Sequence, residues 1–333
     1  MSKFKREFDV DRAKEAVGAP ENAWFKDLIR HWRPAGDAQV TPNPPPGAPL
    51  DHLRLAIRDG YLNFYSAGQS IAKVGFVKGK LQAEIHNKYV YGPEKGRGQE
   101  YVKIISGRFR GQDGADVEYR SELLHHWILN ARAYEEKNKE KRFVEELVAW
   151  QPGVIDLEAA SPSDGEATEE RSGEPKQTKK SAPRMDLVTI EPCGDHYSLV
   201  FREVKLVSNP ETKCENAAKP PRVIAQLTKY ETWLASNRKL VREAYHDCCA
   251  TLVKLHGIAK AVNPAISPLG SAIIAVGQDF APLCVDGTPQ LVIDATMGEG
   301  VFVEHGHLKK LQNYGICVRM VRKPADLVMS AYA

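Results

Sequence analysis

The chain has 333 residues, of which 42% are apolar and 27% charged, which describes a soluble globular protein with material for one large domain or two ordinary ones. The formal net charge of +3 permits nucleic-acid binding without arguing for it. The first residues are charged throughout and no later apolar run is long enough to span a bilayer, so we expect a cytoplasmic protein with no membrane partner.

Residues 1–48 predict a helical arm followed by a stiff, proline-rich linker. Pro34 and the run that ends at Pro49 stop helical structure, which places a domain boundary near residue 48. The arm carries apolar side chains that could cover another surface: Phe4, Phe8, Trp24, Phe25, Leu28, Ile29 and Trp32.

Residues 49–115 predict a small antiparallel β-rich domain, because short β-type runs alternate with turn-forming glycines. Basic residues interleaved with aromatic ones suit phosphate contacts and base stacking, so this domain is a candidate nucleic-acid surface. The alternative is a half-buried sheet whose lysines form its solvated face. The residues concerned are Arg54, Arg58, Lys73, Lys78, Lys80, Lys88, Lys95, Arg97, Lys103, Arg108 and Arg110, with Tyr61, Phe64, Tyr65, Tyr89 and Tyr91.

Residues 116–333 predict a mixed α/β domain. One or two helices span 121–150, interrupted by the charge block at 135–142, and residues 153–160 read as the first core strand. Residues 161–183 are rich in Glu, Ser, Pro and Lys and predict a disordered insertion. Further strands are expected at 271–277, 289–296 and 315–321, with a helix near 305–314.

The runs 183–192 and 196–206 predict an antiparallel hairpin that carries the chemistry. Glu203 and Lys205 are two apart on one strand and therefore point to the same side, and Asp186 can face them from the other strand. Two carboxylates and an ammonium at one strand end make a plausible magnesium site with a lysine beside the attacking water. Gln226 and Tyr230 follow on a long helix, four residues apart and so on one face.

Asp186, the Glu203–Val204–Lys205 triplet and the Q-x-x-x-Y pattern of Gln226 and Tyr230 together resemble the PD-(D/E)XK nuclease superfamily and its exonuclease branches. Met185 stands where many members have proline. The resemblance covers roughly residues 140–260. It implies a restriction-endonuclease-like core, a mixed β-sheet flanked by helices.

The activity implied is Mg²⁺-dependent cleavage of DNA, with Mn²⁺ as a possible substitute and RNA not excluded. Asp186, Glu203 and the Val204 carbonyl would hold the metal, joined by Glu146 from the helix before the sheet. Lys205 would orient or deprotonate the water and stabilise negative charge on the phosphate. Gln226 and Tyr230 would position substrate, and a homodimer or a partner protein would fit.

Two alternatives stay open at this point. The chain could be a non-catalytic nucleic-acid-binding or assembly protein on a nuclease-like fold, or Asp186, Glu203 and Lys205 could form an ordinary cross-strand salt bridge. Glu146 could instead be an ordinary surface glutamate. The remaining candidate ligands lack metal-site spacing and are expected to be free thiols and surface or turn histidines: Cys193, Cys214, Cys248, Cys249, Cys284 and Cys317, with His125, His126, His246, His305 and His307.

Overall fold

The computed structural model describes residues 4–37, 52–92, 101–111, 114–134, 139–160, 184–213, 219–278 and 283–326. The proline-rich stretch 38–51, the predicted insertion 161–183 and Cys214 lie outside these ranges. The described chain is a mixed α/β structure with two sheets, which is the coarse class that the sequence predicts.

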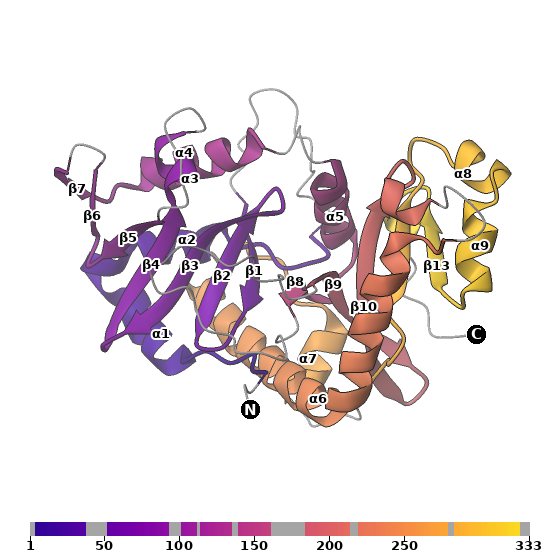
Figure 1. The fold of residues 1–333 in the computed structure, drawn as a ribbon. Coiled ribbons are helices and arrows are strands. Elements are labelled where there is room, and N and C mark those ends of the chain that lie inside the picture. The colour runs from indigo at the N-terminus through magenta and orange to yellow at the C-terminus, as the bar shows by residue number, and fades with distance from the viewer. Residues whose placement is uncertain are drawn as a thin grey trace.

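The first sheet is an antiparallel meander in which neighbouring strands pair in chain order, as Figure 1 shows on its left side. Three of its hairpins turn at Ala67–Gly68, Lys78–Gly79 and Ser106–Gly107, where both residues have positive φ, as type I′ turns require. Its strands are β1 (Arg54–Ile57), β2 (Tyr61–Ser66), β3 (Gln69–Val77), β4 (Lys80–His86), β5 (Tyr101–Ile105), β6 (Arg108–Arg110) and β7 (Asp116–Glu118).

The predicted basic and aromatic surface of this sheet is wrong for five of its members, and Lys95 and Arg97 lie outside the described residues. Phe64, Tyr65 and Tyr89 are at most 2% exposed, and Arg54 and Arg58 are buried against carboxylates. Within this predicted β-rich stretch, residues 87–91 instead form the short helix α3 (Asn87–Tyr91), which begins where the side chain of His86 accepts a hydrogen bond from the Lys88 backbone.

The second sheet has β10 at its centre and strand order β13-β12-β10-β9-β8, with β11 pairing with one end of β10. β9 runs antiparallel to β8 and β10, whereas β12 is parallel to β10 and β13 is parallel to β12. The predicted hairpin is confirmed. Its strands are β8 (Val154–Ala160), β9 (Arg184–Cys193), β10 (His196–Leu206), β11 (Leu283–Val285), β12 (Gln290–Asp294) and β13 (Cys317–Val321).

Helices surround this sheet (Figure 1). The predicted strand at 271–277 is wrong, because SAIIAVG forms α7. A short apolar run fits a buried helix as well as a buried strand, and Gly277 lets α7 approach α6 so closely that an added Cβ would lie 2.7 Å from the Cys249 backbone. These helices are α5 (Lys139–Trp150), α6 (Arg222–Val262, kinked at Asn237), α7 (Ser271–Gln278), α8 (Gly300–Glu304) and α9 (His307–Asn313), whereas α4 (Ser121–Arg132) packs on β2 and β3 of the first sheet.

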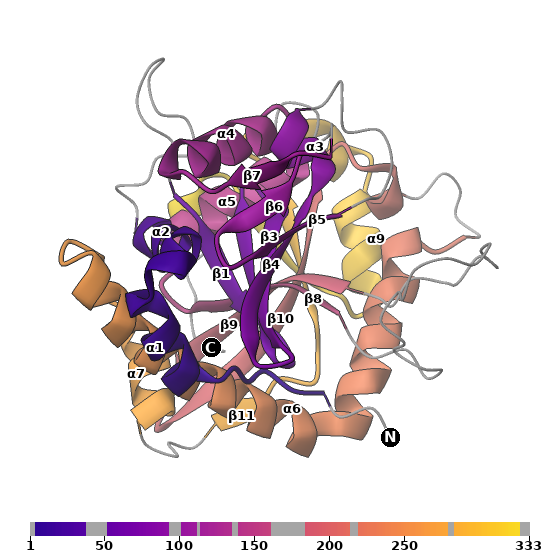
Figure 2. The same ribbon diagram turned by 90° about the vertical axis from the view of Figure 1, so that its left-hand side faces the viewer.

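The N-terminal arm forms α1 (Val10–Gly18), a 3₁₀ turn (Pro20–Asn22) and α2 (Ala23–His31), and its seven predicted apolar side chains are all buried. Figure 2 shows the arm beside the first sheet and α6. One continuous apolar core includes side chains of the arm, both sheets and α6. No helix in the described parts of the chain combines the length and apolar character needed to cross a bilayer.

Candidate active site

The end of the β9–β10 ladder is where the predicted acids meet. The ladder's last backbone pair joins Arg202 to Leu187. One residue beyond it, Asp186 accepts a hydrogen bond on Oδ2 from the Val204 N–H, at 2.7 Å. The Asp186 carboxylate therefore replaces a backbone carbonyl as the acceptor for the Val204 N–H, and it is held against β10.

Glu203 and Lys205 lie side by side on β10, as the strand alternation predicts. Lys205 Nζ is 2.5 Å from Glu203 Oε1, and the two side chains are only 8% and 3% exposed. Phe201 lies two residues before Glu203 and therefore points to the same side of the strand. The centre of its ring is 5.7 Å from that of Tyr230 on α6. An ordinary cross-strand salt bridge on the solvated face of a sheet would leave these side chains exposed, and they are buried.

Glu140, at the start of α5, is the acid that sequence reasoning missed. Its Oε1 lies 3.4 Å from Lys205 Nζ, and its Oε2 accepts a hydrogen bond from Asn209 at 3.0 Å. Glu146, the predicted acid from this helix, pairs with Arg142 at 3.3 Å. The signal was available, because Glu140 shares the helical stripe of the buried Phe143 and Leu147, but it sits inside a charge block that predicts exposure.

Negative charge exceeds positive charge in this cluster. Lys205 Nζ has carboxylate oxygens of Glu203, Glu140 and Glu211 at 2.5, 3.4 and 3.7 Å, and Asp186 adds another acid. Burial and the charge of Glu203 hold the pKa of Asp186 well above its ordinary value. Burial also raises the pKa of Glu203, although Lys205 and Gln226 oppose that shift.

Lys205 is held as an ammonium. Burial alone would lower its pKa, but Glu203, Asp186 and Glu140 outweigh burial, and the pKa is raised. In this arrangement Lys205 is a cation and a hydrogen-bond donor rather than a base.

Gln226 and Tyr230 share a face of α6, but they have different surroundings. Gln226 donates a hydrogen bond from Nε2 to the Arg184 carbonyl, at 3.1 Å, at the first residue of β9. Tyr230 is fully buried, and its hydroxyl donates to the Ala159 carbonyl on β8, at 2.6 Å. Gln226 therefore borders the acidic cluster, whereas Tyr230 anchors the helix to the sheet.

The donor set fits a magnesium ion that is only partly enclosed by protein. The described ranges contain no ready-made group of three or more His, Cys, Asp and Glu side chains that could hold a metal. Mg²⁺ commonly binds one or two carboxylates and completes its shell with water and substrate phosphate. Here Asp186 and Glu203 supply two carboxylates, and Glu203 Oε2 is a buried oxygen with no hydrogen-bond partner among the described residues.

The Val204 carbonyl also fits, because the N–H and C=O of one strand residue point to the same side and its N–H faces Asp186. A cation bound by these groups would offset the excess of negative charge. The residues present are therefore compatible with the metal that the sequence resemblance implies.

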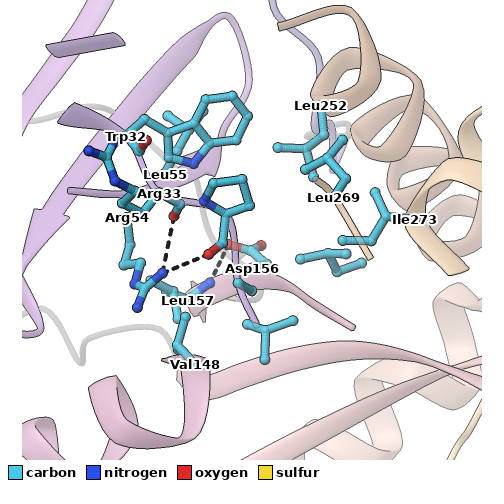
Figure 3. A pocket seen from close by; sticks show the side chains of 14 residues that line it. Trp32, Arg33, Arg54, Leu55, Val148, Asp156, Leu157, Leu252, Leu269 and Ile273 are labelled. Atoms are coloured by element: carbon cyan, nitrogen blue, oxygen red, sulfur yellow. Dashed lines mark hydrogen bonds between the residues drawn. The ribbon is translucent and has the colours of Figure 1, made fainter. Parts of the chain in front are cut away.

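A separate cavity of about 30 Å³ lies between the two sheets and has room for about one water molecule. Figure 3 shows Arg54 at its edge, donating to the carbonyls of Arg33 and Pro34 at 3.2 and 2.7 Å. Its lining shares no residue with the acidic cluster. Its size and mainly apolar lining exclude it as a substrate site.

Searches against protein-family models, curated proteins and solved structures return no match for this chain. The function must therefore be inferred from the residue pattern of this chain and the geometry of the cluster.

Proposed function

We propose that this chain is a magnesium-dependent nuclease that hydrolyses phosphodiester bonds of DNA, on a core related to the PD-(D/E)XK superfamily. The observation that carries the proposal is the convergence of Asp186, Glu203 and Lys205 in a buried cluster with surplus negative charge, in which Glu203 Oε2 finds no hydrogen-bond partner within the described part of the chain. Perturbed carboxylates that gather around one ammonium are typical of functional sites.

The order of elements also favours this family. A helix (α5), a strand (β8), a hairpin (β9 and β10) and a helix (α6) succeed one another. The acid, the acid-x-lysine triplet and the Gln-x-x-x-Tyr pattern fall on the elements where the resemblance requires them. Glu140 would take the part that the sequence assigned to Glu146, the acid from the helix before the sheet.

Asp186, Glu203 and the Val204 carbonyl would hold Mg²⁺, which when bound supplies Lewis-acid activation of water and phosphate. Lys205, kept protonated by Glu203 and Glu140, would donate to the phosphate oxygens and stabilise their charge as the water attacks. Gln226 would hold the first residue of β9 in place and keep Asp186 aimed at the site. Tyr230 would hold α6 against the sheet through its hydrogen bond to the Ala159 carbonyl.

The direct test is cleavage of labelled single-stranded, duplex and end-blocked DNA with Mg²⁺, Mn²⁺ or EDTA. Lys205→Ala should lower metal-dependent cleavage by about 100- to 1000-fold, the usual effect of removing one donor that stabilises the transition state. Lys239→Ala is the matched control, because Lys239 is 83% exposed and also pairs with a glutamate, Glu243, at 3.9 Å.

Thermal melting in Mg²⁺ would show that both variants are folded. Full activity in Lys205→Ala would refute the assignment. DNA binding without cleavage in the wild-type protein, with every metal, would favour the alternative of a non-catalytic binding protein.

A further inference from the structure

The first sheet, with the adjoining α3 and the end of α4, carries a set of ammonium groups and aromatic rings in cation–π and edge-to-face contact, which we call the tyrosine–lysine surface: Lys73, His86, Lys88, Tyr101 and Tyr134. Lys73, His86 and Tyr101 lie on β3, β4 and β5, Lys88 lies on α3, and Tyr134 follows α4. None of the five is buried, and Tyr101 is 45% exposed. Its two lysines are among the basic residues predicted for this role, but its rings are not among the predicted aromatic residues.

The side chains at the β5 end support one another through ring contacts. His86 and Tyr101 are opposite each other in the β4–β5 ladder, and their ring centroids are 5.3 Å apart. Lys73 Nζ lies 5.6 Å from the centre of the Tyr101 ring. Glu84, the acid between Lys73 and Lys103 in the ladder, pairs with Lys103 at 3.3 Å. This end therefore offers an exposed aromatic face beside positive charge.

Lys88 is positioned by two rings rather than by a carboxylate. Its Nζ lies 4.7 Å from the Tyr89 ring centre and 4.6 Å from that of Tyr134. Burial and the nearby ammonium of Lys141 lower its pKa. In the described part of the chain no carboxylate pairs with Lys88. Two ammonium groups held near one another repel, and an anion between them would remove that repulsion.

Lys141 connects this surface to the acidic cluster. It follows Glu140, the residue that contacts Lys205, in the first turn of α5. Lys141 Nζ donates to the Gly68 carbonyl at 2.9 Å and pairs with Glu158 at 2.8 Å, and Glu158 also lies 3.7 Å from Arg184.

The close approach at this joint depends on Gly68. A Cβ at Gly68 would lie 2.8 Å from that of Lys141, so only glycine lets the β2–β3 turn seat on α5. The first sheet is thereby fixed against the element that carries Glu140.

We propose that the tyrosine–lysine surface binds single-stranded DNA and leads it toward the acidic cluster, an inference that rests on the proposed function. Unpaired bases can stack on an exposed aromatic ring, whereas bases inside a duplex already stack on one another. Bases would stack on Tyr101, and Lys73 and Lys88 would contact the phosphates. The preferred substrate is then a single strand or a duplex with a single-stranded end.

The test is fluorescence anisotropy in EDTA, so that binding is measured without cleavage, with a labelled oligothymidylate of about 20 nucleotides and a matched duplex. Tyr101→Ala should weaken single-strand binding by about 5- to 150-fold, the effect expected for one stacked base, and leave duplex binding unchanged. Tyr101→Phe keeps the ring and should bind like the wild type. Lys88→Gln should reduce the slope of log affinity against log salt by about 0.7, as one lost phosphate contact predicts.

Lys239→Gln is the control for the loss of any surface lysine. Unchanged single-strand binding in Tyr101→Ala, or no single-strand binding by the wild type, would overturn this inference even if metal-dependent duplex cleavage is observed. The expected binding pattern without any cleavage would support the surface and count against the nuclease. Equal weakening in Tyr101→Ala and Tyr101→Phe would also overturn the stacking role, because it would assign the DNA contact to the Tyr101 hydroxyl rather than to its ring.

Discussion

Two buried ionic clusters, one around Asp156 and one around Glu203, lie in the same sheet and have opposite charge balance. Asp156 accepts hydrogen bonds from Arg6 and Tyr245, at 2.9 and 2.8 Å, and also from Arg58. Burial alone would raise its pKa, but Arg58 and Arg6 outweigh burial and the pKa is lowered. In the Glu203 cluster the single ammonium of Lys205 faces several carboxyl groups, and the pKa values of Asp186 and Glu203 are raised.

The difference separates a structural cluster from a candidate functional one. The Asp156 cluster joins the N-terminal arm, the first sheet and α6 to the second sheet, because Arg6, Arg58 and Tyr245 come from those three parts. Its carboxylate is fully satisfied. The Glu203 cluster keeps unfavourable charge and an oxygen that has no hydrogen-bond partner among the residues the structure describes, features that a folded protein retains where a ligand or a reaction uses them.

The largest expected effect comes from Asp156→Ala. It leaves two buried guanidinium groups without their carboxylate, and breaking a buried ion pair costs about 3–5 kcal/mol of unfolding free energy. Urea denaturation at neutral pH would measure this cost. Glu203→Gln is the matched variant in the other cluster and should cost little, since it removes a charge that is already disfavoured. An equal loss in both variants would contradict the distinction between the clusters.

The sequence predicts the hairpin and its acids because strand alternation is local. Glu203 and Lys205 share a side by spacing alone, and the turn at Gly194 and Asp195 brings Asp186 back beside them. Residue spacing could not reveal that Asp186 bonds the Val204 N–H. That contact depends on where the backbone ladder ends, which is set by the packing of the whole sheet.

The missed residues depend on contacts between segments far apart in the chain. The sequence predicts a surface cation at Arg58, because a basic residue in a β-type run is usually solvated. Its partner Asp156 is 98 residues away in the chain. The sequence predicts that Tyr89 stacks on bases, yet its side chain is buried beneath Lys88. Polarity patterns predict which residues can be exposed, but the partner element decides which ones are.

A smaller effect, of opposite sign, is expected from Asp186→Asn. The pKa of Asp186 is raised, so the folded state holds its proton more tightly and stability falls as pH rises above the ordinary carboxyl range. Asparagine keeps an oxygen for the Val204 N–H and removes the charge, so the metal-free variant should be more stable than the wild type by about 1 kcal/mol at pH 7 and equal to it near pH 4.

Urea denaturation in EDTA at a series of pH values would measure that difference. In Mg²⁺ the wild type should gain stability and Asp186→Asn should not, because under the proposed function only the wild type has both carboxylates that would hold the ion. The stabilisation by Mg²⁺ should also increase with pH, since the metal must displace a proton from the carboxylates. A variant less stable than the wild type in EDTA at pH 7 would show that Asp186 is a satisfied structural acid.

An effect of similar size is expected at Tyr230, a residue that lies between the two clusters. Its ring packs on Phe201, and its hydroxyl satisfies the buried Ala159 carbonyl. Tyr230→Phe keeps the ring and removes one hydrogen bond, so it should cost about 1 kcal/mol of unfolding free energy and leave cleavage per folded molecule nearly unchanged. Gln226→Ala should show the reverse, with little loss of stability and a clear loss of cleavage, because Gln226 borders the acids. Loss of cleavage in Tyr230→Phe, measured on protein whose folding is verified by thermal melting, would place the Tyr230 hydroxyl in the reaction. The active site would then extend about one helical turn along α6, from Gln226 to Tyr230.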